Sequence, residues 1–540
     1  MLPRIQDFLD QLVEPKPSFS LQDLDAFPYS EYNSNLTRYS ELESWYTGEA
    51  LDETVERQGK EVELYPVKVN PIKRTVEQHT YFLFGQVKQD DRPLVYPKIN
   101  PLDATDDAQV KSAKDLEDIL LRVWTESNGR ANQWQNGAQS QLYGGNIFRL
   151  VYDPIDPLRT IPIRIESIHP KSFVGIPDGR DIWRVRECWI VRAINHQEAL
   201  EHGVTIPESE QPWLVEHLTN TLIEVSVNGT PASRLVDGKW IPLSGENIWG
   251  FVPVVYIPHI RVYGFYGETF IDCVQGIVKE LNLRLADFGD AITADAHRYL
   301  GMRNVSGAPT IQQLAPALYA VNLHSNPMMT GQEAEPDLFE LGNARASDPM
   351  KTLIDLLYLV YRRLVAVPAV ADGEDEGSQR SGLTLVTRMI SLISHTDSER
   401  IFWTTGLNLL TRMLIKMLLM LPDSLRKSVG VKPEHLLFPV RQEWAPVLPR
   451  DREMIVQEVV ALMQAKLGSI ERLLDLLGVD NPSEERDMIL KDIEELSEIE
   501  AEAQAKANPP LPPVAGVKGN SDSAAKGTPA REANQKKDKE

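Results

Sequence analysis

Cysteine is nearly absent from this chain of 540 residues, which contains Cys188 and Cys273 far apart in the sequence. A framework of disulfides is therefore excluded, and assembly in a reducing cytoplasm is the expected setting. Both thiols are expected to behave as small, buried apolar side chains.

Basic residues are in deficit. Lysine and arginine number 56 against 78 aspartates and glutamates, which gives a net charge of −22. A monomeric protein that grips DNA phosphates normally has a basic patch and a positive balance. Nucleic acid is therefore not held by simple attraction, and any role with DNA must be guidance.

Long apolar runs are missing as well. The stretch from Leu407 to Leu421 is interrupted by Arg412 and Lys416, so no membrane-spanning segment is expected. The N-terminus contains Asp7 and has no apolar core, which is not typical of a signal peptide.

Signatures of catalysis are also lacking. The sequence has no Gly-x-x-x-x-Gly-Lys-Ser/Thr phosphate loop, no His-Glu-x-x-His zinc helix and no Gly-x-Ser-x-Gly elbow. Its ten histidines are scattered, and no Cys/His spacing suits a metal. The chain is not expected to be an enzyme, and no cofactor is predicted.

What the sequence does contain is a mixed α and β pattern, mainly helical, on a chain too long for one ordinary core. Residues 1–60 are acidic and rich in turn residues, with short apolar clusters. A helix is predicted from residue 70 to a C-terminal cap at Gly85, and another from about 110 to 142. Apolar and polar residues then alternate from 147 to 194, and further strands are expected up to about residue 259.

The most informative pattern is a helix predicted over 267–300, roughly 50 Å long. Apolar residues recur there at spacings of three and four and form one stripe. This stripe comprises Phe270, Val274, Ile277, Leu281, Leu285, Phe288 and Ile292. Asp272, Lys279 and Asp290 lie on the opposite face, flanked by Glu280 and Asp287.

Beyond this helix the pattern changes several times. A compact, loop-rich stretch over 301–345 precedes a second apolar helix that Pro368 ends. An acidic, glycine-containing loop follows, and then a helix predicted from Leu383 to Leu421, near 60 Å long. Two or three shorter helices are expected up to about Ala507, and the residues after it have a composition typical of disorder.

Several local motifs, in this order, resemble the portal proteins (head–tail connectors) of long-tailed bacteriophages over roughly residues 40–480. They include Trp45-Tyr46-Thr47-Gly48, Asn70-Pro71-Ile72-Lys73, Leu142-Tyr143-Gly144-Gly145, Val278-Lys279-Glu280-Leu281-Asn282, Ser381-Gly382-Leu383 and Pro449-Arg450-Asp451. Each motif is weak alone, and their order makes the signal strong. The acidic loop departs from the family, because it is longer and more acidic than the common Ser-Ser-Gly version.

The resemblance implies a portal fold that assembles as a ring of twelve subunits at one capsid vertex. The implied parts are a wing (1–266), a stem helix (267–300), a clip (301–345), a second stem helix (346–366), a tunnel loop (367–382), a spine helix with a return to the wing (383–449), a crown (450–507) and a disordered tail (508–540). The implied location is the virion, after assembly in the host cytoplasm.

The resemblance also implies partners. The clip would dock the large subunit of the terminase motor and later the head-completion or adaptor proteins. The wing would contact the major capsid and scaffolding proteins, and double-stranded DNA would pass through the channel during packaging and ejection. No membrane is involved.

Two sets of residues would face this DNA. In the tunnel loop they are Asp372, Glu374, Asp375, Glu376, Gln379 and Arg380, and on the stem they are Asp272, Lys279, Asp287 and Asp290. DNA has one negative charge per about 1.7 Å, so an acidic wall would keep the duplex solvated and centred, whereas a basic wall would stall it. The alternative is that these acids only solvate an ordinary surface helix and an exposed loop.

Two other classes of function remain open at this stage. A non-catalytic helical scaffold or adaptor would explain the long helices and the missing catalytic motifs, but not the β-region, the insert and the acidic loop. An enzyme whose site forms only between subunits is the third interpretation. The mass of the purified protein separates a large closed ring from a monomer or dimer.

Overall fold

The computed structural model describes residues 19–57, 60–64, 67–85, 92–103, 105–236, 238–296, 298–305, 311–315, 318–324, 337–341, 347–372, 387–447, 452–479 and 482–507. The chain divides into two compact units, Met1–Pro449 and Arg450–Glu540. Helix accounts for 53% and strand for 20%, so the prediction of a mixed, mainly helical class is confirmed.

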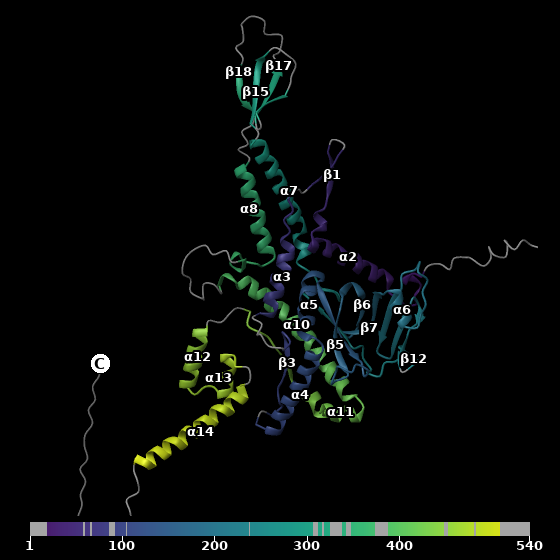
Figure 1. Cartoon of the computed structure of the whole chain (residues 1–540), viewed down its shortest axis with the longest axis vertical. Helices are drawn as coiled ribbons and strands as arrows, with labels where there is room; N and C mark the ends of the chain where they lie inside the picture. The colour runs from purple at the N-terminus through teal and green to yellow at the C-terminus, as the bar shows by residue number, and fades with distance from the viewer. Residues whose placement is uncertain are drawn as a thin grey trace, which may run out of the picture. The chain divides into compact units, whose positions relative to one another are not determined.

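The longer helices of the first unit supply most of its framework (Figure 1). They are α2 (Tyr29–Thr47), α3 (Pro71–Phe84), α4 (Asp107–Glu126), α5 (Gly129–Tyr143), α7 (Ile271–Ala296), α8 (Ser347–Leu364) and α10 (Ile390–Leu419). Short helical segments are η1 (Leu21–Asp23), η2 (Glu49–Leu51), η3 (Pro170–Ser172), α6 (His196–Glu201), η4 (Ala369–Asp372), α11 (Asp423–Val429) and η5 (Pro433–Leu437).

The strands of the first unit form several small sheets. The largest has the order β10-β9-β8-β7-β6, with β13 paired to β9, and uses β6 (Phe173–Asp178), β7 (Asp181–Ala193), β8 (Trp213–Thr219), β9 (Leu222–Val227), β10 (Thr230–Pro231) and β13 (Gly245–Glu246). A second has the order β14-β4-β5 and uses β4 (Gly145–Tyr152), β5 (Ile163–Ile168) and β14 (Val254–Pro258). The two-stranded pairs are β1 (Thr54–Arg57) with β2 (Lys60–Glu63), β11 (Ser233–Val236) with β12 (Lys239–Pro242), and β3 (Tyr96–Ile99) with β19 (Val440–Glu443).

Two apolar cores organise the helices. The first packs α4 and α10 against the β14-β4-β5 sheet around the fully buried Trp403 and Phe148. The second joins α2, α3, the start of α7 and the end of α8 through buried Trp45, Val274 and Tyr361. Apolar side chains at helical and strand spacing therefore meet across elements that lie far apart in the sequence.

Two differences concern the N-terminal helices. The helix predicted over 110–142 is two helices, because Asn128 adopts a left-handed conformation (φ +53°) that ends α4 and opens α5. Helix α2 occupies a segment described from the sequence only as acidic and turn-rich. Its buried positions, Tyr32, Tyr39, Leu42 and Trp45, are mostly aromatic and stand among many polar residues, so its apolar stripe is faint.

The predicted long helices are shorter in the structure. Helix α7 ends at Ala296, and residues 298–300, predicted to be helical, begin strand β15. Helix α10 begins at Ile390 and has 30 residues, so it is roughly 45 Å long, not 60 Å. No proline or glycine in the sequence marks the C-terminal end of α7 or the N-terminal end of α10.

The stretch 301–345, predicted to be loop-rich, contains most of a four-stranded sheet of order β16-β17-β15-β18. Its strands are β15 (Arg298–Val305), β16 (Ile311–Ala315), β17 (Leu318–His324) and β18 (Asp337–Leu341). The central pair β15 and β17 is parallel.

The second unit is helical over its described residues. It consists of α12 (Arg452–Gln464), α13 (Ile470–Leu477) and α14 (Pro482–Ala507). Arg486 ties α14 to α13 through an ion pair with Glu471 at 2.7 Å. The predicted tail from residue 508 lies outside the described residues.

The cysteines differ from each other. Cys188 is buried in the large sheet, as predicted, whereas Cys273 is exposed on α7. The prediction for Cys273 was wrong, because the adjacent Val274 occupies the buried side of the helix.

Close backbone contact between Gly144 and Gly267 yields a first prediction. A Cβ on Gly267 would lie 2.2 Å from the Gly144 carbonyl oxygen, and Gly144 itself has a φ of +80°. Gly267→Ala should lower the free energy of unfolding by about 1–3 kcal/mol, since backbone atoms must shift.

Gly276 of α7 is the matched control, because a Cβ added to this residue would have no neighbouring atom within 4 Å. Gly276→Ala should raise the free energy of unfolding by up to about 1 kcal/mol through helix propensity. Urea denaturation followed by tryptophan fluorescence measures both variants in the first unit, where all ten tryptophans lie. Equal stability of the two variants would contradict the close approach.

Candidate functional site

Helices α7 and α8 form an antiparallel pair, with the four-stranded sheet inserted between them in the sequence (Figure 1). Within the described residues, the pair is anchored at the end where α7 begins and α8 finishes. Ile271, Val274 and Val278 at the start of α7 and Tyr361 at the end of α8 are buried in the second core. Further along α7, Leu285 and Phe288 are half-buried and Ile292 is 50% exposed. The predicted apolar stripe is therefore covered within the chain over its first half alone.

Asn282 fixes where the anchored half of α7 ends. Its fully buried side chain accepts from the Val69 backbone N–H at 2.7 Å and donates to the Val69 carbonyl at 2.9 Å. The amide thereby holds the segment preceding α3 against α7. Asn282 is the last residue of the motif that begins at Val278, but its role as an amide clamp was not predicted from the sequence.

The four stem residues predicted to face DNA lie in different settings. Asp272 pairs with Arg38 of α2 at 3.1 Å, and Lys279 pairs with Glu53 at 2.9 Å, so both contact the chain's own N-terminal region. Asp287 pairs with Arg284 one turn away at 2.9 Å. Asp290 is exposed and has no ion pair with any residue the structure describes. Asp290 is therefore the one of the four whose charge is not offset by a neighbour in these ranges.

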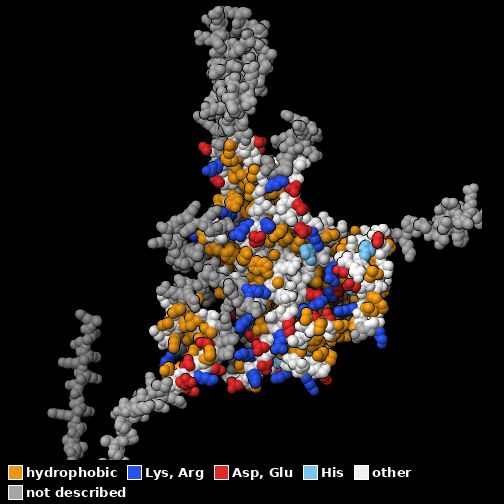
Figure 2. All heavy atoms as spheres, viewed as in Figure 1, with side chains coloured by type: hydrophobic (Ala, Val, Ile, Leu, Met, Phe, Trp, Pro, Cys, Tyr) orange, Lys and Arg blue, Asp and Glu red, His pale blue; other side chains and the backbone are white. Residues whose placement is uncertain are grey.

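Helix α8 presents an apolar stripe to solvent. Leu353, Leu356, Val360 and Leu364 follow one another at spacings of three and four, and their exposed fractions are 38%, 52%, 36% and 51%. Figure 2 shows hydrophobic side chains gathered over the helical pair. We call these four residues the α8 stripe. Contiguous exposed apolar surface of this kind marks an interaction site.

The last turn of α8 is held from α3. The Thr75 and Tyr361 hydroxyls lie 2.8 Å apart, and His79 Nε2 lies 2.8 Å from the Val365 carbonyl oxygen. The next residue, Ala366, has a φ of +55°, which redirects the chain toward η4. The start of the predicted tunnel loop is thus fixed by contacts that α3 supplies.

The tunnel loop itself is described only at its start. Val367 is buried, and Asp372 is the last residue of η4. The other predicted channel residues, Glu374, Asp375, Glu376, Gln379 and Arg380, lie outside the described residues. Their predicted role stays a prediction.

A buried polar cluster lies beside this junction. Glu399 of α10 accepts from the Gln141 amide at 2.6 Å, and its Oε1 lies 3.1 Å from His259 Nδ1. The ring of His395 packs between those of His79 (4.9 Å between centroids) and His259 (5.6 Å). Burial lowers the pKa of His79 to about 3, and His395 also lowers it. Three of the ten histidines, which are scattered in the sequence, therefore meet near one carboxylate.

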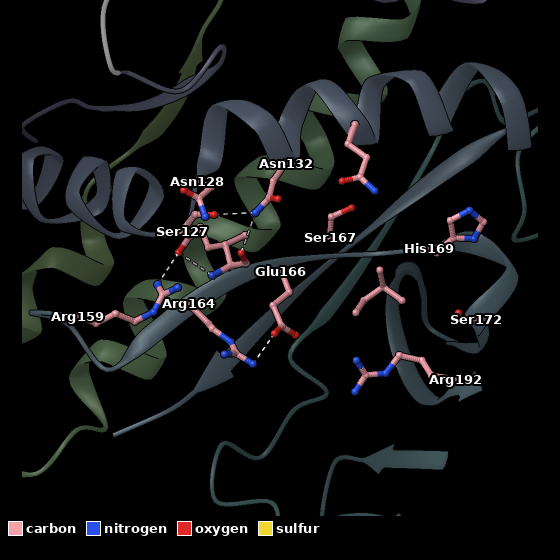
Figure 3. Close-up of a pocket in the computed structure, with 13 residues that line it drawn as sticks. Ser127, Asn128, Asn132, Arg159, Arg164, Glu166, Ser167, His169, Ser172 and Arg192 are labelled. Atoms are coloured by element: carbon pink, nitrogen blue, oxygen red, sulfur yellow. Dashed lines mark hydrogen bonds and ion pairs between the residues drawn. The ribbon is translucent and has the colours of Figure 1, made fainter. Parts of the chain in front are cut away.

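A polar groove of about 450 Å³ lies where α4 gives way to α5 (Figure 3). Arg159, Arg164 and Arg192 line it, together with Ser127 and Asn132. Each arginine already has a carboxylate partner, namely Asp156 at 2.8 Å, Glu166 at 2.5 Å and Glu216 at 3.3 Å, respectively. An anion entering this groove would have to displace an existing ion pair.

Across the described ranges, no group of three or more His, Cys, Asp or Glu side chains is arranged to hold a metal ion. None of the helices in those ranges combines the length and apolar character needed to cross a bilayer. Comparison with known proteins found no matching family model and no matching curated protein.

Proposed function

We propose that this protein is the subunit of a bacteriophage portal, a ring of twelve copies that forms a DNA channel at one capsid vertex. In this role it serves genome packaging by the terminase motor, connection of head and tail, and ejection of DNA. The observation that carries the proposal is the α7–α8 pair, which holds an inserted sheet and leaves the α8 stripe uncovered.

The order of elements supports the proposal. A mixed α and β region precedes α7, the four-stranded sheet separates α7 from α8, and α10 follows the acidic loop. This order matches the wing, stem, clip, second stem, tunnel loop and spine that the resemblance implies. The helical second unit follows in the sequence, over the residues for which the resemblance implies a crown.

The apolar surface supports assembly. Four large apolar side chains on one helical face would be unfavourable in water for an isolated subunit, and contact with a neighbouring copy would remove them from solvent. A ring places every subunit between two neighbours, so the stripe of each copy has a partner.

The negative net charge supports a channel that guides DNA without binding it tightly. Each copy adds −22, and Asp290 contributes an exposed carboxylate in the second half of α7. Repulsion of this kind steers a duplex over a screening length of about 8–10 Å at physiological ionic strength. On this proposal the sheet β15–β18 docks the terminase large subunit and then the head-completion or adaptor proteins, and the wing meets the capsid and scaffolding proteins.

Replacing Leu356 and Val360 together by Asp tests the assembly. Both side chains are exposed in the single chain, so the subunit should still fold, but two added charges in the contact should abolish the ring. Light scattering should then report a mass near 60.9 kDa, that of one subunit, and electron micrographs should show no rings.

Lys351→Glu is the matched control, because it changes the charge of the same helix by the same two units at an exposed position away from the stripe. Its rings should match those of the unaltered protein. Rings formed normally by the double variant would remove α8 from the contact. A monomer or dimer of the unaltered protein would instead favour the adaptor.

A further inference from the structure

The β11–β12 hairpin leaves an apolar pair largely uncovered. Leu235 and Trp240 are cross-strand partners on one face of this two-stranded sheet, and they are 53% and 50% exposed. Part of the Trp240 ring lies against Gly203, and the Ser233 backbone N–H donates to the His202 carbonyl at 2.9 Å at the base of the hairpin. A two-stranded hairpin is marginally stable in water by itself, so exposed apolar side chains on it indicate a surface that something covers.

The described part of the chain begins close to this hairpin. A Cβ on Gly229 would lie 3.6 Å from Cε2 of Phe19, which places Phe19 beside the turn between β9 and β10. The hairpin begins at Ser233, four residues after Gly229, and four residues of extended chain span at most about 14 Å. The residues that precede Phe19 are therefore tethered within reach of Leu235 and Trp240.

The sequence ahead of Phe19 has the pattern of an amphipathic helix. Its apolar residues recur at spacings of three and four and share one helical face, namely Leu2, Ile5, Phe8, Leu9, Leu12 and Val13. Its acids, Asp7, Asp10 and Glu14, fall on the opposite face. Residues 14–18 join this pattern to Phe19 and span up to about 17 Å, so the apolar face can be placed on the hairpin.

We propose that residues 2–13 dock on the β11–β12 hairpin of the same chain and cover Leu235 and Trp240 with their apolar face. The position of Phe19 favours this occupant over a separate molecule, because a short tether gives the segment a high effective concentration at the hairpin.

Charge also favours this occupant. Lys239, next to Trp240, is exposed and has no ion pair with any residue the structure describes. Asp7, Asp10 and Glu14 outnumber Arg4, the one basic residue among residues 2–14, so docking brings an acidic segment to an unpaired cation. The inference concerns one chain and does not depend on the proposed ring.

Leu9→Asp tests the inference, because it places a charge in the middle of the apolar face. Hydrogen exchange of the full-length chain, followed by mass spectrometry, measures the protection of the hairpin amides. We expect residues 233–242 to exchange at least tenfold faster in this variant than in the unaltered protein. Leu235→Asp, at an exposed position of the hairpin, should in turn speed the exchange of residues 2–13.

Gln11→Asp is the matched control, because it adds the same charge two residues away on the polar face. Its hairpin should exchange as in the unaltered protein, and equal rates in Leu9→Asp and Gln11→Asp would overturn the proposal. Protection should also persist in the Leu356→Asp, Val360→Asp variant, which separates neighbouring copies. Loss of protection there would assign the hairpin to a second copy, which overturns this inference and leaves the ring proposal standing.

Discussion

Acidification from pH 7 to pH 5 is expected to lower the free energy of unfolding of the first unit by about 2 kcal/mol through His79 alone. Burial holds the pKa of His79 at about 3, against an ordinary value of 6.5. The unfolded chain therefore binds this proton more tightly, and stability present above pH 6.5 is lost progressively as the pH falls toward 3.

Two neighbours of His79, His395 and Glu399, also make the folded protein less stable as the pH falls. Burial lowers the pKa of His395, and nearby His259 lowers it further. Burial alone would raise the pKa of Glu399, but His259, His395 and the Gln141 amide outweigh it, so the net shift is downward. The stabilising charge of Glu399 is then lost when the pH falls through its lowered pKa, which adds to the acid sensitivity.

His79→Gln isolates the contribution of one histidine. The glutamine amide can still donate toward the Val365 carbonyl, but it does not titrate. Urea denaturation at pH 7 and pH 5, followed by tryptophan fluorescence, should show a pH dependence smaller by about 2 kcal/mol than in the unaltered protein. An identical pH dependence in the two proteins would mean that His79 is not buried in its neutral form.

Trp403→Ala should lower the free energy of unfolding of the first unit by about 3–5 kcal/mol. Trp403 is fully buried at the centre of the first core and makes edge-to-face contacts with Phe84 (5.6 Å) and Phe148 (6.1 Å). Its removal would leave a cavity between α3, α10 and the β14-β4-β5 sheet, which cannot collapse without moving whole elements.

Trp403→Phe is the informative comparison. The indole N–H is buried and has no hydrogen-bond partner, so phenylalanine keeps much of the apolar ring and removes an unsatisfied donor. We expect a loss of less than about 1.5 kcal/mol. Urea denaturation followed by circular dichroism measures both variants without relying on the replaced fluorophore. Similar losses for the two variants would show that the N–H, and not the packing, dominates.

Elements with strong local signals were predictable. Helix α3 follows from an Asn70 cap, Pro71 at its first position and Gly85 beyond its end, and the structure has all three in these roles. Strands β5 and β7 follow from alternation, because one face of each packs on a core. The start of α7 follows from residues spaced by three and four, of which Val274 and Leu281 are buried.

Elements that depend on distant partners were not predictable in this way. Residues 298–300 have a helix-compatible sequence, but they are strand because β15 pairs with both β17 and β18. Tertiary packing outweighed local propensity there. The break at Asn128 had a local signal that the prediction overlooked, because asparagine adopts the left-handed conformation readily and Asn128-Gly129 is typical of a turn.

The sequence by itself determined the mixed class, the deficit of positive charge and the long amphipathic helices, because composition and periodicity depend on neighbouring residues alone. Only the tertiary structure decided which apolar faces are covered, since burial depends on what else packs there. It left the α8 stripe and the Leu235–Trp240 pair exposed. It also brought His79, His259 and His395, which lie in three separate segments, close to the carboxylate of Glu399. Their spacing along the chain does not predict this cluster.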